Sequence, residues 1–499
     1  MPTLPPRPRI ASGPSRHVYD ALVLGAELGG ALAAALLAKR GLRVLWAEHA
    51  NLAPGYEHDG FLFSSPPYVV PPFRTWPMVE SCFTELGLTT GFQRSLKPVG
   101  PWQVVLPRHR LDLPVDAPRR LSELQREFGN GGSRVAETLG SLTAMPEGSD
   151  PFFRFLDDFA PGGWLERIRL RRRAARVEGL TRPSPLSVDE PLEALLTGVV
   201  PFLVQQEPAG PLGVTRVLAQ LLKTALRLPG GREGMRETLG KRFTELGGTL
   251  LSQEGLAGRA VDGVDFEGSQ VTLRVRGAEA VYRAQWLVAA MDPALLAGLL
   301  PEEGPGKKVA EHLGQLMPKR LVLPVHWVLP EKVLPRGMGE LVLMDGGQTG
   351  PVWIQVQPTR RAGTRGEQES LRTVTASTLV GSGVRDAGES GLRLPAAGME
   401  RALEALMPFS LAERVTRSVP LVDGPGALAG AGPQVIYESV GGAATGLEGL
   451  GVRTPAKHVM FAGREAVLGV GLEGELLAGA RAAALVHEHV RKRDPLKKR

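Results

Sequence analysis

The sequence predicts an α/β protein in which a domain with a parallel sheet is interleaved with a second, α+β domain. The first observation is a short apolar run, Ala21 to Leu24, which suits a buried parallel strand and leads directly into a glycine-rich turn. The second is another glycine turn far along the chain, Gly469 to Gly474, which opens a long helix. Because strand-rich and helical stretches alternate between these turns, we expect one domain to be assembled from separated segments.

The first turn has the pattern of a dinucleotide-binding unit. Gly25 and Gly30 frame it, a helical stretch over 31–39 follows, and a second strand over 42–47 ends at Glu48. An acid about 20 residues after the first glycine is the usual ligand of a ribose hydroxyl. Without a ligand, the same residues would form an ordinary strand-helix-strand crossover.

Glu27 is out of place in this pattern. It stands where a glycine normally lets the backbone approach a diphosphate. A carboxylate about 4 Å from a phosphate charge costs roughly 4 kcal/mol at an effective dielectric near 20, or about a thousandfold in affinity. If a dinucleotide binds, another group must offset this repulsion between Glu27 and the phosphate.

Composition indicates an ordinary globular protein. The chain has 499 residues, 43% of them hydrophobic and 22% charged, with a net charge of +7 and a single cysteine, Cys82. One cysteine allows no intrachain disulfide, so we expect a cytoplasmic protein. No recognisable nucleic-acid module accompanies the basic tail at 491–499, and no metal-binding motif is present, so neither nucleic acid nor a metal is expected.

The order of elements predicts domain boundaries. We expect a tail over 1–17, a first domain from 18–75, 208–299 and 431–490, a second domain from 76–207 and 300–430, and a basic tail over 491–499. Asp59-Gly60 is predicted to be a hairpin turn, and 212–226 an apolar helix.

Three stretches, 19–48, 229–292 and 459–484, together with their order, resemble the flavin-dependent family of phytoene desaturases, protoporphyrinogen oxidase and flavin amine oxidases. The resemblance covers nearly the whole chain. It implies a flavin-type, Rossmann-like dinucleotide-binding domain for FAD with an interleaved α+β substrate domain. Carried over residue by residue, it implies that the following positions contact FAD: Gly25, Gly30, Glu48, Leu256, Gly463, Leu472 and Glu473.

The chain departs from this family along the middle of the expected cofactor. Glu27 replaces the central glycine, Arg464 replaces an acid that binds the ribityl chain, and the family's Gly-Gly-Arg segment is missing or eroded. Since Glu27 and Arg464 have opposite charge and would line one cavity, we expect them to pair and partly fill it. Alternatively, Arg464 binds the diphosphate and Glu27 turns away, leaving weakened flavin binding.

Two functions follow from the resemblance. One is an FAD-dependent oxidoreductase in which an apolar or amine substrate gives hydride to the flavin; the residues single out no catalytic acid or base. The other is a non-catalytic relative with an empty or collapsed flavin site that acts as a binding or scaffold protein.

A basic amphipathic helix raises one further expectation. Trp164, Leu165 and Ile168 share a helical face, and arginines at 167, 169, 171 and 173 lie mostly around the rest. Such a helix suits peripheral contact with an anionic membrane. A solvated arginine-rich face is the simpler interpretation of the same pattern.

Overall fold

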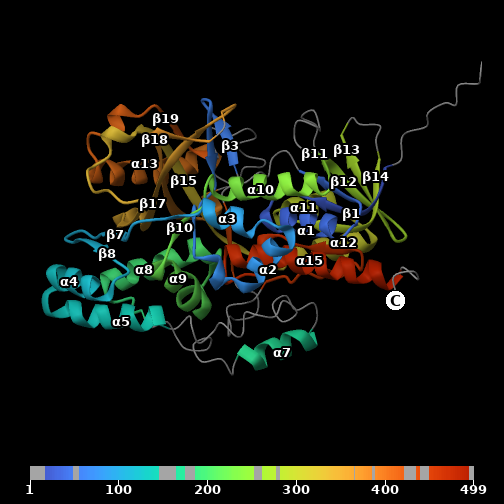
Figure 1. The fold of residues 1–499 in the computed structure, drawn as a ribbon, viewed down its shortest axis with the longest axis horizontal. Helices are drawn as coiled ribbons and strands as arrows, with labels where there is room; N and C mark the ends of the chain where they lie inside the picture. The colour runs from blue at the N-terminus through green and yellow to red at the C-terminus, as the bar shows by residue number, and fades with distance from the viewer. Residues whose placement is uncertain are drawn as a thin grey trace, which may run out of the picture.

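The computed structural model describes residues 17–48, 55–144, 164–174, 186–251, 261–276, 281–364, 366–384, 388–420, 434–438 and 449–493. Within these ranges the chain forms two large sheets, and helices lie around them (Figure 1).

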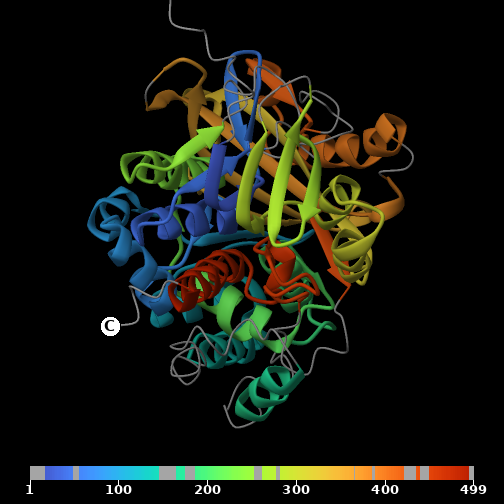
Figure 2. The same cartoon turned by 90° about the vertical axis from the view of Figure 1, so that its right-hand side faces the viewer.

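The first sheet has seven strands and is the predicted parallel sheet. Its order is β11-β2-β1-β14-β13-β12, with β21 beside β14. The pairs among β11, β2, β1, β14 and β21 are parallel, whereas β12 and β13 are antiparallel. The strands are β1 (His17–Leu24), β2 (Val44–Ala47), β11 (Thr249–Leu251), β12 (Val261–Glu267), β13 (Gln270–Val275), β14 (Tyr282–Ala289) and β21 (Val459–Phe461). In Figure 2, β12 to β14 appear in yellow-green above the red helix α15 (Leu472–Arg493).

Helix α1 (Leu28–Lys39) is the buried centre of this region. It is almost entirely alanine, leucine and glycine, and every residue from Leu28 to Ala38 is buried. It lies between α10 (Gly231–Glu245) and α15 (Figure 1). A Cβ atom on Gly479 would lie 2.0 Å from the carbonyl oxygen of Gly29, so α1 and α15 approach as closely as backbones allow.

The second sheet has eleven strands and draws on many segments. Its order is β8-β7-β16-β17-β18-β15-β20-β9, with β19 beside β15 and the β3–β4 hairpin attached to β17. The strands are β3 (Gly55–His58), β4 (Phe61–Ser64), β7 (Trp102–Val105), β8 (Arg110–Leu113), β9 (Gln206–Glu207), β15 (Pro318–Pro330), β16 (Leu341–Asp345), β17 (Pro351–Arg361), β18 (Glu367–Gly381), β19 (Thr416–Ser418) and β20 (Val435–Glu438). The Asp59-Gly60 turn is confirmed, with φ of 50° and 74° at its two residues.

The two sheets interleave along the chain as expected, but the predicted segments contribute to both. The hairpin β3–β4 and strand β20 come from stretches that we assigned to the first domain, and they hydrogen-bond in the second sheet. The domain boundaries themselves stay a prediction.

The remaining helices pack around both sheets. They are α2 (Pro77–Leu86), α3 (Thr89–Ser95), α4 (Ala117–Phe128), α5 (Gly132–Ala144), α7 (Trp164–Ala174), α8 (Pro191–Val204), α9 (Ala219–Lys223), α11 (Pro293–Leu299), α12 (Gly304–Leu313) and α13 (Gly388–Leu406). Helices α11 and α12 pack against β12 of the first sheet, and α4, α8 and α13 pack against strands of the second. The predicted helix over 212–226 was too long. It consists of a π-helical turn, Gly213–Leu218, and α9, and the chain then forms β10 (Leu226–Arg227) in a small sheet with β5 (Val69–Val70) and β6 (Lys97–Pro98).

Candidate functional site

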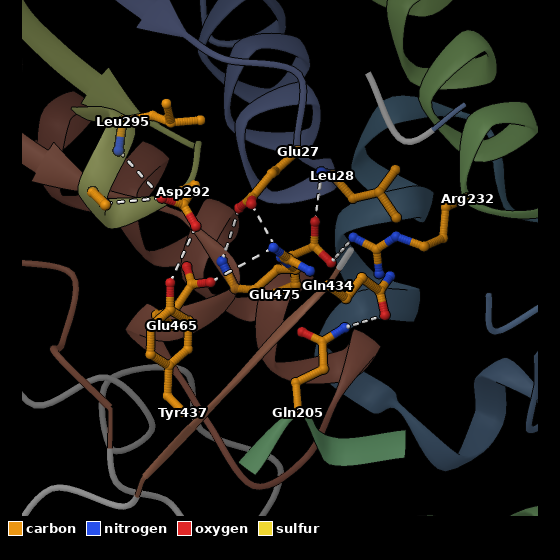
Figure 3. Close-up of polar contacts among 12 residues, drawn as sticks. Glu27, Leu28, Gln205, Arg232, Asp292, Leu295, Gln434, Tyr437, Glu465 and Glu475 are labelled. Atoms are coloured by element: carbon orange, nitrogen blue, oxygen red, sulfur yellow. Dashed lines mark hydrogen bonds and ion pairs between the residues drawn. The ribbon is translucent and has the colours of Figure 1, made fainter. Parts of the chain in front are cut away.

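The site lies where the turn after β1 meets the start of α15. Glu27, Glu465 and Glu475 come from separate segments and converge there (Figure 3). The glycine turns at 25 and 469 therefore belong to one region of the molecule, as the family resemblance implied.

Gly25 and Gly30 are required by packing. Gly25 has φ of 108°, and a Cβ atom on it would lie 2.1 Å from the carbonyl oxygen of Ala290. A Cβ atom on Gly30 would lie 2.6 Å from the Cβ atom of Ala290. Because close contact with Ala290, the residue after β14, explains both glycines, they do not by themselves indicate a ligand.

The expected pairing of Glu27 with Arg464 is confirmed. The Arg464 backbone N–H donates to Glu27 Oε2 at 2.9 Å, and Arg464 Nε donates to Glu27 Oε1 at 3.0 Å. Both side chains are about nine-tenths buried. Burial raises the pKa of Glu27, while the charge of Arg464 opposes that rise.

Glu475 occupies the N-terminus of α1. Its Oε1 accepts the backbone N–H of Leu28 at 2.7 Å, and its Oε2 pairs with Arg232 Nη2 at 2.5 Å (Figure 3). The side chains of both charged residues are almost fully buried, at 1% and 3% exposure. In a dinucleotide-binding fold the diphosphate accepts hydrogen bonds from backbone amides at this end of the helix. Here the side chain of Glu475 accepts the Leu28 amide in place of a diphosphate.

Glu48 and Glu473, two predicted cofactor contacts, are also ion-paired. Glu48 Oε1 pairs with Arg236 Nη1, and Arg236 also bonds Glu233. Glu473 accepts Arg216 Nε at 2.9 Å and Arg216 Nη2 at 2.8 Å, with both side chains 1% exposed.

The other predicted site residues have different positions. Gly463 precedes the short turn Arg464–Ala466, and a Cβ atom on it would lie 2.6 Å from the Phe461 ring. Leu472 is buried at the start of α15. Leu256 lies outside the described residues. The cofactor contacts assigned to these residues stay predictions.

Glu465 is the acid of the cluster with the weakest pairing. It is 1% exposed, its Oε1 lies 3.7 Å from Arg464 Nη2, and its buried Oε2 has no hydrogen-bond partner. Burial raises its pKa well above the usual value, the charge of Glu27 adds to that rise, and Arg464 opposes it. Nearby, Tyr437 Oη donates to Asp292 Oδ2 at 3.2 Å. Within the cluster of Glu27, Glu465, Glu475, Arg232 and Arg464, burial therefore disfavours the charged form of Glu465.

Replacing Glu465 with glutamine is expected to flatten the dependence of stability on pH. An acid whose pKa is higher in the folded state binds its proton more tightly there, so stability falls as pH rises from about 4.5 through that raised value. Glutamine keeps the neutral form, so the variant should match wild type near pH 4.5 and melt at a higher temperature in alkaline buffer. Melting temperatures measured across this range test it, with the exposed Glu404→Gln as the control. Parallel melting curves for wild type and Glu465→Gln would contradict it.

Sequence reasoning missed the charged partners Glu475, Arg232, Arg236 and Arg216. The signal was present for Glu475, because an acid directly before Leu476 and Leu477 in a buried helix needs a partner. The identity of that partner depends on contacts across 243 residues of chain.

These residues do not fit FAD bound in the usual way. Two carboxylates, those of Glu27 and Glu475, lie at the helix end that would hold the diphosphate, and the ribose-type acid Glu48 is engaged by Arg236. We therefore assign no chemical step to a flavin here.

The fold is shared with several solved oxidoreductases, in agreement with the fold that the resemblance implied. An oxidoreductase from Methanosarcina mazei aligns over 92% of this chain and 99% of its own, with a TM-score of 0.59 and 14% identity. Cyclohexylamine oxidase from Brevibacterium oxydans aligns over 95% and 99%, with a TM-score of 0.55 and 18% identity. A putative protoporphyrinogen oxidase from Exiguobacterium aligns over 97% and 100%, with a TM-score of 0.54 and 13% identity.

The similarity is one of structure. No protein-family model matches the sequence, and neither does any curated protein. At 13% to 18% identity the shared fold does not carry an activity with it.

Two further properties concern the described residues alone. None of their helices is long and apolar enough to cross a membrane. They contain no group of three His, Cys, Asp or Glu side chains placed to hold a metal ion.

Proposed function

We propose that this chain is a non-catalytic binding protein that keeps the fold of flavin-dependent oxidoreductases while its own side chains fill the diphosphate end of the dinucleotide groove. The observation that carries the proposal is the carboxylate of Glu475 on the amide of Leu28, held there by Arg232. A bound diphosphate would need the same donor and would meet two buried carboxylates.

Three ion pairs support this function together. Glu27–Arg464, Glu475–Arg232 and Glu48–Arg236 join segments that a cofactor would otherwise bridge. Each pair links residues far apart in the chain, so the set connects the first turn and the end of β2 to α10 and to the segment that enters α15 without a ligand.

The second candidate is an FAD-dependent oxidoreductase acting on an apolar or amine substrate. It is favoured by alignment of over nine-tenths of the chain with solved oxidoreductases and by the contact between the segments that follow its two glycine turns. In that case the ion pairs must open when FAD binds. A cytoplasmic location fits both candidates.

Titration of the purified protein with FAD distinguishes the two. We expect colourless protein, no flavin absorbance near 450 nm after gel filtration, no heat of binding, and no rise in melting temperature with added FAD. Protein that purifies yellow, or that FAD stabilises against heat, would overturn the proposal and support the oxidoreductase.

A further inference from the structure

Helix α7 presents apolar and cationic side chains to solvent on one face. Leu165 and Ile168 are 53% and 36% exposed, and Arg169 and Arg172 are exposed beside them. These four positions follow the spacing i, i+3, i+4, i+7, which places them on a single side of a helix. We call this set the α7 outer face.

The opposite side of α7 is attached to the molecule. Leu170 is 5% exposed and belongs to the main hydrophobic core, and Glu166 lies 3.7 Å from Arg453. These contacts fix which side of the helix faces outward. In Figures 1 and 2, α7 lies at the lower margin of the molecule.

The charge of α7 is strongly positive. Its eleven residues, WLERIRLRRRA, contain five arginines and one glutamate. The whole chain also carries a net charge of +7. Neutral membranes and basic partners do not complement such a face, whereas an anionic surface does.

We propose that the α7 outer face docks on an anionic lipid surface, with Leu165 and Ile168 entering the headgroup boundary and Arg169 and Arg172 contacting lipid phosphates. Arginine suits this place because its aliphatic stem lies along apolar surface while the guanidinium reaches the phosphates. A helix with exposed leucine or isoleucine between arginines is the pattern of interfacial helices. The inference is independent of whether FAD binds.

Co-sedimentation of the full chain with lipid vesicles tests this proposal. We expect binding to vesicles of mixed phosphatidylcholine and phosphatidylglycerol, no binding to phosphatidylcholine alone, and weaker binding at high salt. The double variant Arg169→Gln/Arg172→Gln should bind about 25-fold more weakly, since each arginine near an anionic surface contributes about fivefold. Leu165→Ser/Ile168→Ser should also weaken binding to the anionic vesicles.

Matched controls separate the outer face from general charge and hydrophobicity. Arg119→Gln on α4 and Leu394→Ser on α13 remove an exposed arginine and an exposed leucine elsewhere, and both should bind as wild type. A chain ending at Arg493 lacks the last basic residues of the sequence and should still bind.

Three results would overturn the inference. The first is that the wild-type chain does not bind anionic vesicles, which is the result expected if the face binds an acidic protein instead. The second is that the outer-face variants bind as tightly as wild type. The third is that binding is lost when only the residues after Arg493 are removed.

Discussion

Replacing Glu27 with glycine and Glu475 with alanine in one chain is expected to raise its affinity for FAD by about a thousandfold or more. The change removes two carboxylates from the N-terminus of α1 and frees the amide of Leu28. It also leaves Arg464 and Arg232 without these partners, so both guanidiniums become available to a diphosphate. Calorimetry and flavin absorbance of the variant measure the gain.

The single variants show which obstacle dominates. If charge repulsion at the turn is the main barrier to FAD, Glu27→Gly alone should give much of the gain in FAD affinity. If the main barrier is that the Leu28 amide is already occupied, Glu475→Ala alone should give it. Glu85→Ala, which removes a carboxylate from the surface pair with Arg40, serves as the control and should leave FAD affinity unchanged. A double variant that folds and still shows no affinity for FAD would mean that steric closure excludes the cofactor.

Replacing Arg216 with methionine is expected to destabilise the protein by about 3–5 kcal/mol. The change leaves the carboxylate of Glu473, 1% exposed, without its bidentate partner, and it removes the Arg216 hydrogen bond to the Thr75 carbonyl oxygen. A buried charge that loses its bidentate partner costs far more than a lost surface contact. Urea unfolding followed by circular dichroism measures the loss.

A second substitution distinguishes the pair from the packing around it. Arg216→Met combined with Glu473→Leu removes both charges and keeps similar volume, so it should recover most of the lost stability. Glu85→Ala, at an ion pair whose side chains are 20% and 35% exposed, should cost no more than about 1 kcal/mol. A double variant as unstable as Arg216→Met alone would contradict the charge argument.

Local patterns in the sequence predicted much of the fold. The apolar run before Gly25, the Asp59-Gly60 turn and the helix after Gly471 depend on neighbouring residues, and the structure has all three. The over-long helix at 212–226 has a simple cause, because a continuous apolar run has the same composition whether it forms one helix or a helix followed by a strand.

The charged site was predictable only in part. Glu27 and Arg464 could be paired in advance because each replaces an expected residue and the two changes have opposite sign. Arg216, Arg232 and Arg236 replace nothing recognisable, and they meet their acids across 257, 243 and 188 residues. From the sequence alone, an arginine in a helix is as consistent with a solvated surface as with a buried ion pair. The three-dimensional structure was needed to show that these arginines are buried and paired.

The closure of α1 by α15 has a consequence for biosynthesis. The amide of Leu28 is satisfied by a side chain 447 residues later, and the side of α1 that faces α15 is covered only when that helix has been synthesised. The ribosome therefore synthesises the chain from α1 as far as α15 before this core is complete, and the nascent chain exposes one side of an alanine- and leucine-rich helix throughout that interval. Chaperones that shield such segments should associate with the growing chain, and a premature stop before Leu472 should yield an aggregating product.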